Sequence, residues 1–482
     1  MADRLSAVDV SVLESETTSR PAHVGSVQLF EAPPGGFDHE RLVRLIRERI
    51  AYVPRFRRRL RGVPGGLANP VWVDDESFDV TYHVRRSALP RPGSREQLDE
   101  LVARIMGRPL ERQRPLWELY LVEGLADGGF ALLSKTHESM IDGLSSVDLG
   151  QVILDSTPTP REPSPDHWRP EPEPSPIELV ASALSDALRR PADAITDAWQ
   201  SVTESVGDLR EAGSRLGGQV VSLAAQAARI ARPAVRSILT TEVGGSRRFA
   251  TLDLSLDSLR MLRDAHGGTV NDVVIAVVTG GLRSWLLDMR DPLDPARPLR
   301  AVVPVSVEAD DVHPVSRVEP LLLDLPLAEP DPLARLHRIS FDMAEHGRVG
   351  HLLGARSIAD AVGFAPPTLH ALGARVGATL TRRAASLVIA NVPGPQHALY
   401  ASGSRLRAAY PVVPLPPGHA LSVGATSYDG RVFLGITSDR DVIDDPGALV
   451  NCMVESMCEL ESMPVGHASR RPFTIAGTGQ DR

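Results

Sequence analysis

The side chains best suited to proton transfer lie close together in the segment SKTHESMIDG. His137 and Glu138 are adjacent, and Asp142 and Gly143 follow shortly after them. Imidazole and carboxylate groups act as general bases when a substrate must lose a proton. The spacing does not fit the H-E-x-x-H pattern of a zinc helix, because Ile141 stands where the second histidine would be. The segment therefore predicts a proton-transfer site, and we expect no metal in it.

Regular elements are expected on both sides of this segment. ELYLVEG and FALLSK flank LADGG, which predicts a β-hairpin with glycine in its turn. The second strand runs directly into THESMIDG, and the apolar spacing of LSSVDLGQVILD predicts a helix after it. A loop between a strand and a helix often carries catalytic groups, because rigid elements hold both its ends.

Strand and helix patterns alternate along most of the chain. HVGSVQLFE (23–31) predicts a half-buried strand, and HERLVRLIRERIAYV (39–53) predicts an amphipathic helix. TVNDVVIAVVTGGLRSWLLDM is typical of a buried helix, and ASLVIANVPGP predicts a strand that ends in a proline turn. A hairpin is expected around Asp429-Gly430. These patterns predict an α/β fold with mixed sheets.

Changes in composition divide the chain into four parts. Residues 1–156 and 247–464 carry the alternating patterns of two domains. Residues 157–246 begin with a proline-rich, extended linker and continue with amphipathic helices. The polar tail at 465–482 is expected to be disordered.

The middle part contains a helix start and a long apolar stripe. Ser175, Pro176 and Glu178 form a helix N-terminus with a capping serine and proline at the first position. Apolar residues then recur in steps of three and four over residues 195–230, which is a heptad stripe. The stripe packs on the protein's own domains, or it contacts a partner helix or a lipid surface. The sequence leaves these alternatives open.

Size and charge limit the classes of function. At 482 residues the chain predicts two domains, and its 42 % hydrophobic and 23 % charged residues are typical of a globular protein. The net charge of -9 argues against nucleic acid as a partner, because phosphate binding needs a basic surface. Lys135 is the only lysine, which we attribute to the codon bias of a GC-rich genome.

The cysteines and the N-terminal segment indicate the cellular compartment of the protein. Cys452 and Cys458 form no disulfide framework and are expected to be buried thiols in a reducing compartment. The N-terminal segment is acidic where a signal peptide would be basic, and no apolar run approaches the ~20 residues of a membrane span. We expect a cytoplasmic protein whose membrane contact is peripheral. A phosphate-binding P-loop and a G-x-S-x-G nucleophile elbow are both lacking from the sequence.

Several motifs together resemble the bacterial wax ester synthase/diacylglycerol acyltransferase family. LSAVDVSVLESE, PAHVG, RPLWELYLVEGL and KTHESMIDG occur in this order in the first half. TVNDVVIAVV, LRAVVPVS, NVPGP and SYDGRVFLGITSD follow in the second half. The resemblance covers nearly the whole chain except the linker and the tail.

The resemblance implies a fold and an activity. Such proteins have two chloramphenicol-acetyltransferase-like halves with a central tunnel, and here a helical linker would join them. They transfer an acyl group from acyl-CoA, the co-substrate, to diacylglycerol or a long-chain alcohol, at a membrane or lipid-droplet surface. No cofactor or metal is implied. An alcohol hydroxyl needs a base to attack a thioester, and imidazole, with a pKa near 6.5, suits this task.

The chain departs from the family motif at the residue that matters most. The motif reads His-His-x-x-x-Asp-Gly, and its second histidine is the base. The corresponding residue here is Glu138, while His137 matches the first histidine and Asp142 and Gly143 match the end. Three hypotheses remain: Glu138 is the base with a pKa raised by burial, His137 turns inward and serves, or the site binds acyl chains, CoA or lipid without turnover.

Other family motifs supply candidate substrate-binding residues. Pro115, Leu116 and Trp117 match one motif, and Asn271 and Asp272 match another. For both motifs a structural role, in the core or at a helix start, is the stronger interpretation.

The NVPGP motif supplies the last candidates. Asn391, Pro393 and Gly394 lie where the tunnel wall and the acyl-CoA contacts are expected. Ala390 replaces the threonine that usually precedes this motif, and HPVSRV replaces a usual Gly-Asn. Both departures weaken the expectation of activity.

Overall fold

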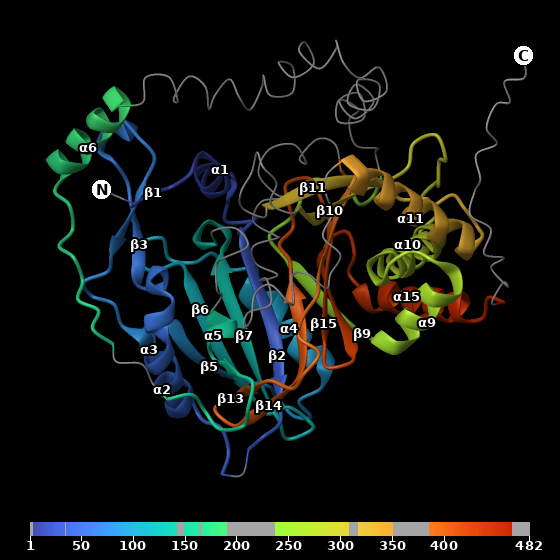
Figure 1. Ribbon diagram of the computed structural model, residues 1–482, viewed down its shortest axis with the longest axis horizontal. Coiled ribbons are helices and arrows are strands. Elements are labelled where there is room, and N and C mark those ends of the chain that lie inside the picture. Colours follow the sequence, from blue (N-terminus) through green and yellow to red (C-terminus); the bar gives the residue numbers. More distant parts are fainter. Residues whose placement is uncertain are drawn as a thin grey trace, which may run out of the picture.

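The chain folds into layers of sheet and helix in a computed structural model (Figure 1). The described residues are 3–33, 35–141, 149–162, 166–189, 237–307, 317–349 and 385–464. Asp142 and Gly143 of the motif, the heptad stripe at 195–230 and the tail at 465–482 lie outside them. Within the described ranges the strands form three sheets.

A seven-stranded sheet carries the segment with His137 and Glu138. Its strands, in spatial order, are β5 (Val84–Ala88), β6 (Trp117–Glu123), β7 (Phe130–His137), β2 (His23–Phe30), β14 (Ser404–Val412), β13 (Tyr400–Ala401) and β8 (Leu154–Asp155). The predicted hairpin is confirmed as β6 and β7. The strand predicted at 23–31 is confirmed as β2. The prediction of a half-buried strand was wrong, because all residues of β2 are buried and not only those on one face. It is a central strand between β7 and β14, with helix α4 (Arg95–Met106) packed against it.

Two strands of this sheet come from the far end of the chain. β14 pairs antiparallel with β2, from Leu406 opposite Phe30 to Val412 opposite Gly25. β13 pairs with both β14 and β8. The sheet of the first half is therefore completed by residues of the second half. The division into domains at residues 156 and 247 remains a prediction, and the sheet crosses it.

The second sheet has six strands. In spatial order they are β11 (Arg317–Asp324), β10 (Arg300–Val307), β12 (Leu387–Val392), β15 (Leu421–Tyr428), β16 (Arg431–Asp439) and β9 (Arg247–Ser255). The predicted hairpin is confirmed as β15 and β16. Asp429 and Gly430 form its turn with φ of 46° and 79°, the positive values that a tight two-residue hairpin requires.

Helices cover this second sheet and form a core with it. They are α9 (Leu256–His266), α10 (Val270–Asp288), α11 (Pro332–Val349) and α15 (Pro446–Glu461) (Figure 1). The buried helix predicted from TVNDVVIAVV is confirmed as α10. It is long and apolar enough to cross a membrane, but 72 % of its apolar window is buried inside the fold, as is typical of a core helix.

A small third sheet and several helices complete the first half. The sheet contains β1 (Asp3–Arg4), β4 (Val71–Asp74) and β3 (Arg58–Arg61). The helices are α1 (Ala7–Ser15), α2 (His39–Arg49), η1 (Ile50–Tyr52), η2 (Pro54–Arg57), η3 (Pro64–Gly66), α3 (Val80–His83), η4 (Glu138–Met140) and α5 (Leu149–Val152), and the linker adds α6 (Pro176–Arg189). The helix predicted after the motif is only partly described. Its described part ends at Val152, because Leu154 and Asp155 pair with β13 as a strand.

The linker follows the surface of the first half as an extended chain. Asp166 forms an ion pair with Arg57, and Glu173 forms one with Arg59. The predicted helix start is confirmed at α6, where the Ser175 N–H donates to Glu178 at 2.7 Å. The proline-rich segment is thus fixed to the first half by charged contacts.

Candidate active site

The backbone of the motif is held between two neighbouring strands. His137 is the last residue of β7 and pairs with His23 across the ladder to β2. Its N–H donates to the carbonyl of Leu116 at 2.9 Å, and the N–H of Glu138 donates to Ala22 at 3.0 Å. These bonds fix the directions in which the two motif side chains leave the strand end.

The His137 side chain is enclosed by its own turn and by the first helix. Its Nδ1 accepts the backbone N–H of Ser139 at 3.1 Å and lies 2.7 Å from the Ser139 hydroxyl oxygen. A neutral ring that accepts at Nδ1 carries its proton on Nε2. This Nε2 lies 3.6 Å from a carboxylate oxygen of Glu16, the residue directly after α1. His137 is 1 % exposed, so both ring nitrogens are directed into a buried cluster.

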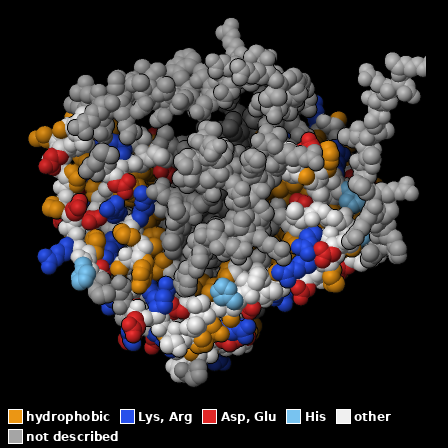
Figure 2. All heavy atoms as spheres, viewed as in Figure 1, with side chains coloured by type: hydrophobic (Ala, Val, Ile, Leu, Met, Phe, Trp, Pro, Cys, Tyr) orange, Lys and Arg blue, Asp and Glu red, His pale blue; other side chains and the backbone are white. Residues whose placement is uncertain are grey.

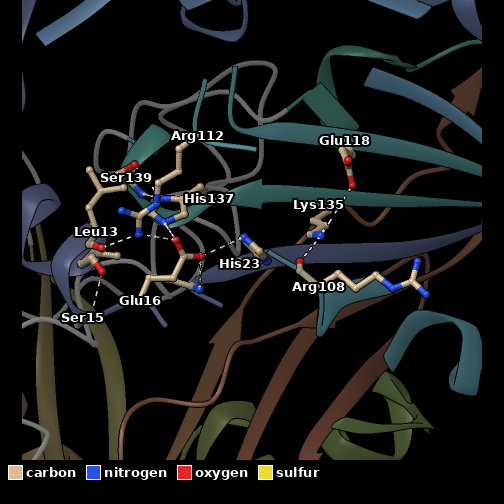
Figure 3. Close-up of polar contacts among 12 residues, drawn as sticks. Leu13, Ser15, Glu16, His23, Arg108, Arg112, Glu118, Lys135, His137 and Ser139 are labelled. Atoms are coloured by element: carbon tan, nitrogen blue, oxygen red, sulfur yellow. Dashed lines mark hydrogen bonds and ion pairs between the residues drawn. The ribbon is translucent and has the colours of Figure 1, made fainter. Parts of the chain in front are cut away.

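Glu16 is the centre of that cluster (Figure 3). Besides His137, its carboxylate lies 3.3 Å from Nε2 of His23 and 2.8 Å from Nη2 of Arg112. Burial raises the pKa of Glu16, but the nearby rings of His137 and His23 and the guanidinium of Arg112 outweigh it and hold the pKa well below its ordinary value. Burial lowers the pKa of His23 to about 4 in spite of Glu16, so this ring is neutral at neutral pH. Glu16 is therefore an anion held among imidazoles and a guanidinium.

The Glu138 side chain lines a cavity of about 40 Å³ between the two sheets. The described lining residues are Val12, Ser15, Arg20, Pro21, Ala22, Glu138, Val388 and Val413–Pro417. Val12 and Glu138 belong to the first half of the chain, whereas Val388 of β12 and Val413 belong to the second half, so both halves contribute to the wall. Among the described residues the Glu138 carboxyl group has no hydrogen-bond partner. Burial, with a smaller effect from the negative charge of Glu16, raises the pKa of Glu138 to about 8.

The two motif residues therefore point into different surroundings. His137 lies among Glu16 and Ser139, whereas Glu138 borders the cavity. This agrees with the opposite directions of neighbouring side chains on a strand. Asp142 and Gly143 are outside the described residues.

The predicted residues Pro115, Leu116 and Trp117 support the motif from the core. Leu116 and Trp117 are completely or almost completely buried, and the indole N–H of Trp117 donates to Phe56 at 2.8 Å. The ring of His83 stacks on Trp117 at 4.5 Å. None of the three predicted residues lines the cavity beside Glu138, and their role as substrate contacts remains a prediction.

The predicted residues of the second half form a separate cluster. The side-chain amide of Asn391 donates to Asn271 at 2.8 Å and joins β12 to the start of α10. Asp272 accepts the N–H of Thr269 at 2.8 Å and closes a capping box. A Cβ on Gly394 would lie 2.2 Å from the carbonyl oxygen of Ser427, so only glycine fits this approach.

Asn271 and Asn391 are therefore brought together, as are the helix start and the strand end that carry them. Within the described ranges, no hydrogen bond, ion pair or ring contact of the neighbouring Pro393 assigns it a role. None of Asn271, Asp272, Asn391, Pro393 and Gly394 lines the cavity. Their binding of substrate stays a prediction.

Sequence reasoning missed a buried cation next to the motif. Lys135 is 1 % exposed, and its ammonium group donates to the carbonyls of Ile105 at 3.1 Å and Arg108 at 2.6 Å. Figure 3 shows Lys135 between Arg108 and Glu118. Glu118 lies 3.7 Å away. Burial lowers the pKa of Lys135 to about 8, against the charges of Glu118 and Glu16. The signal available in the sequence was that this residue is the only lysine of the chain.

Glu16, His23 and Arg112 were also missed as site residues. Glu16 and His23 lie in the motifs LSAVDVSVLESE and PAHVG, which carried the family resemblance. Nothing within these motifs indicated that two strands and a helix end would bring their polar groups together.

Comparison with known proteins places the chain in a family. The wax ester synthase/diacylglycerol acyltransferase catalytic domain matches residues 5–274, and the C-terminal domain of the same family matches residues 317–461. A Mycobacterium tuberculosis protein named "probable diacyglycerol O-acyltransferase" is 34 % identical over 473 residues, which cover 94 % of this chain and 97 % of that protein. A second protein of that organism with the same description is 41 % identical over 266 residues, covering 55 % of this chain and 96 % of the relative.

Solved structures agree with this placement. The wax ester synthase/diacylglycerol acyltransferase from Marinobacter aquaeolei VT8 superposes with a TM-score of 0.64 at 28 % identity, covering 95 % of this chain and 98 % of that chain. The first condensation domain of the CDA synthetase superposes with a TM-score of 0.54 at 15 % identity, covering 96 % and 97 %, and indicates the fold alone. The expected two-part α/β fold is confirmed. The chain belongs to the wax ester synthase/diacylglycerol acyltransferase family.

Proposed function

We propose that this protein transfers a long-chain acyl group from acyl-CoA to diacylglycerol or to a long-chain alcohol, with Glu138 as the general base. Family membership supports the acyl transfer. One observation carries the assignment of the base: Glu138 is the only carboxyl group among the described residues that line the cavity between the sheets. His137 is engaged with Ser139 and Glu16 and does not line it.

Burial makes the carboxylate of Glu138 a competent base. A glutamate with an ordinary pKa of ~4.3 would hold an alcohol proton too weakly to assist its attack. In this cavity the pKa is raised to about 8, so the ionised carboxylate is a stronger base than an ordinary imidazole with a pKa of ~6.5. At neutral pH, however, only a fraction of the protein molecules have an ionised Glu138 carboxylate.

The reaction can then be written with Glu138 as the group that takes and returns one proton. The carboxylate accepts the hydroxyl proton as the alcohol oxygen attacks the thioester carbonyl, which gives a tetrahedral intermediate and a neutral carboxyl group. The intermediate collapses with cleavage of the carbon–sulfur bond, and the departing thiolate takes the proton back from Glu138. The products are an ester and CoA, and the carboxylate is regenerated.

The cluster around Glu16 positions this base in the proposal. Glu16 holds His137, and the turn that begins at His137 carries the Glu138 side chain toward the cavity. We therefore assign Glu16 and His137 as positioning residues.

The substrates suggest where the protein acts. Diacylglycerol and long-chain alcohols partition into lipid, so we propose a cytoplasmic protein that associates peripherally with the membrane or with lipid droplets. Separation of cell extracts into cytosolic, membrane and lipid-droplet fractions tests this location.

A transfer assay with radiolabelled acyl-CoA tests the activity. Purified protein is offered diacylglycerol or hexadecanol beside the variants Glu138→Gln, Glu138→His and His137→Ala. Glu138→Gln preserves the shape of the side chain, so a loss of about 10²–10⁴ in rate assigns the base. Glu138→His restores the family residue and is expected to retain transfer.

Two other results would redirect the assignment. Transfer that survives in Glu138→Gln and disappears in His137→Ala would assign the base to His137. A silent wild type that gains activity in Glu138→His would mean that the native site binds its ligands without turnover.

A further inference from the structure

The cavity beside Glu138 has a cationic side chain on its wall. Of the described residues that line it, only Arg20 is cationic. Arg20 ends the turn that starts at Thr17, where two backbone hydrogen bonds of 2.9 and 3.2 Å join the two residues. Arg247 holds the same turn in place, because its Nη2 donates to the carbonyl of Ser19 at 2.8 Å. Arg20 is thus carried on a fixed turn at the junction of the two halves.

The Arg20 guanidinium has no partner within the described part of the chain. It forms no ion pair and no hydrogen bond there, although Arg20 is half-buried. The guanidinium of Arg20 lies near that of Arg247. Burial and the charge of Arg20 together lower the pKa of Arg247, whereas the carboxylate of Asp439, 3.6 Å from Arg247, raises it. The guanidinium groups of Arg20 and Arg247 therefore lie close enough to repel each other.

Among the described residues that line the cavity, the charges do not balance. Glu138 is mostly neutral at neutral pH, because its pKa is raised to about 8, and it gives Arg20 little compensation. A cation that is partly removed from water without a counter-charge is unfavourable, and an anion brought by a ligand relieves this cost. A guanidinium matches phosphate especially well, since its planar fork can donate two parallel hydrogen bonds.

We propose that Arg20 binds a phosphate group carried by one of the two substrates. The inference rests on the proposed function and adds a binding residue to it. Two sources supply the same chemistry: the phosphates of acyl-CoA, or a phosphate next to the hydroxyl group of an acceptor lipid. In either case Arg20 fixes the substrate by its charge, while Glu138 handles the proton.

Pairs of substrates with and without a phosphate group separate the two sources. The donors are palmitoyl-CoA and palmitoyl-pantetheine, and the acceptors are diacylglycerol and lysophosphatidate. Arg20→Gln is expected to raise KM about tenfold or more for one phosphate-bearing substrate and to leave its uncharged counterpart unchanged. Arg20→Lys keeps a point charge and should lie between wild type and Arg20→Gln. Arg44, exposed on α2, provides the matched control, since Arg44→Gln changes the net charge equally at a distant surface.

A binding measurement makes the result independent of turnover. Titration calorimetry with CoA and with lysophosphatidate should show that Arg20→Gln weakens the affinity for one of them about tenfold, less so at high salt. If the wild type forms no ester but binds the phosphate ligand through Arg20, the phosphate site stands and the acyl transfer fails. Equal affinities in wild type, Arg20→Gln and Arg44→Gln would overturn the proposal. So would an equal KM increase for charged and uncharged substrates, which would indicate a packing role for Arg20.

Discussion

Raising the pH from 6 to 8 increases the ionised fraction of the Glu138 carboxyl group, and the proposed mechanism needs this carboxylate form. With a pKa of about 8, about one molecule in ten is ionised at pH 7 and about one in a hundred at pH 6. The value of kcat/KM for acyl transfer should therefore rise about tenfold for each pH unit below 8 and level off above it. A glutamate with an ordinary pKa of ~4.3 would give a flat profile over this whole range.

The measurement is a pH profile of transfer to a neutral acceptor, with Glu138→Gln as the blank for spontaneous loss of the thioester. Glu138→His provides the contrasting profile, because an imidazole has an ordinary pKa of ~6.5 and burial lowers it further. Its rise should end below about pH 6.5. A wild-type profile that is flat between pH 6 and 8, or that follows the profile of Glu138→His, would refute the assignment of Glu138 as a buried base.

Three further predictions concern stability. The folded-state pKa of Glu138 lies above its ordinary value of 4.5, so wild type should lose stability as the pH rises from about 4.5 to 8, by about 1.4 kcal/mol per pH unit. Glu138→Gln should not show this loss. Thermal unfolding of both proteins at pH 5 and pH 7 checks the difference, and the same pH dependence in both would contradict it. The pKa of Glu16 is held below its ordinary value, so its stabilising effect is complete above about pH 4.5 and is lost on acidification. Loss of one partner of a buried ion pair costs about 3–5 kcal/mol, so Glu16→Gln should lower the free energy of unfolding by this amount at pH 7 in urea unfolding, with a smaller difference below pH 4. The bond between Asn271 and Asn391 predicts a coupling energy of about 0.5–1.5 kcal/mol in a double-mutant cycle of alanine variants, and additive effects would mean that the bond contributes nothing.

Local sequence patterns predicted the elements that depend on neighbours in the chain. The hairpin around Asp429 and Gly430 followed from a two-residue turn chemistry, and the helix start at Ser175 followed from its cap. The buried helix at TVNDVVIAVV followed from an unbroken apolar run. In each case the physical cause lies within a few residues and can be read from them.

The parts that failed depend on contacts between distant residues. The sequence identified His137 and Glu138 but could not show which of them borders the cavity, because the wall comes from Val388 and from Val413–Pro417. The pKa of Glu138 depends on burial in this cavity, so the sequence could not predict its value either. The full burial of β2 could not be foreseen either, since one of its neighbours is β14.

The pairing of β2 with β14 also bears on how the protein is made. β2 ends at Phe30 and its partner begins at Ser404, so a ribosome completes most of the chain before the sheet of the first half can close (Figure 1). Until then one edge of β2 has unpaired backbone groups, which favour pairing with another chain. We expect a fragment of residues 1–156 to aggregate, and its rescue by a separately supplied second half would be a form of fragment complementation. Because β14 is made so late, we expect nascent chains to need a chaperone that covers this edge of β2 during synthesis.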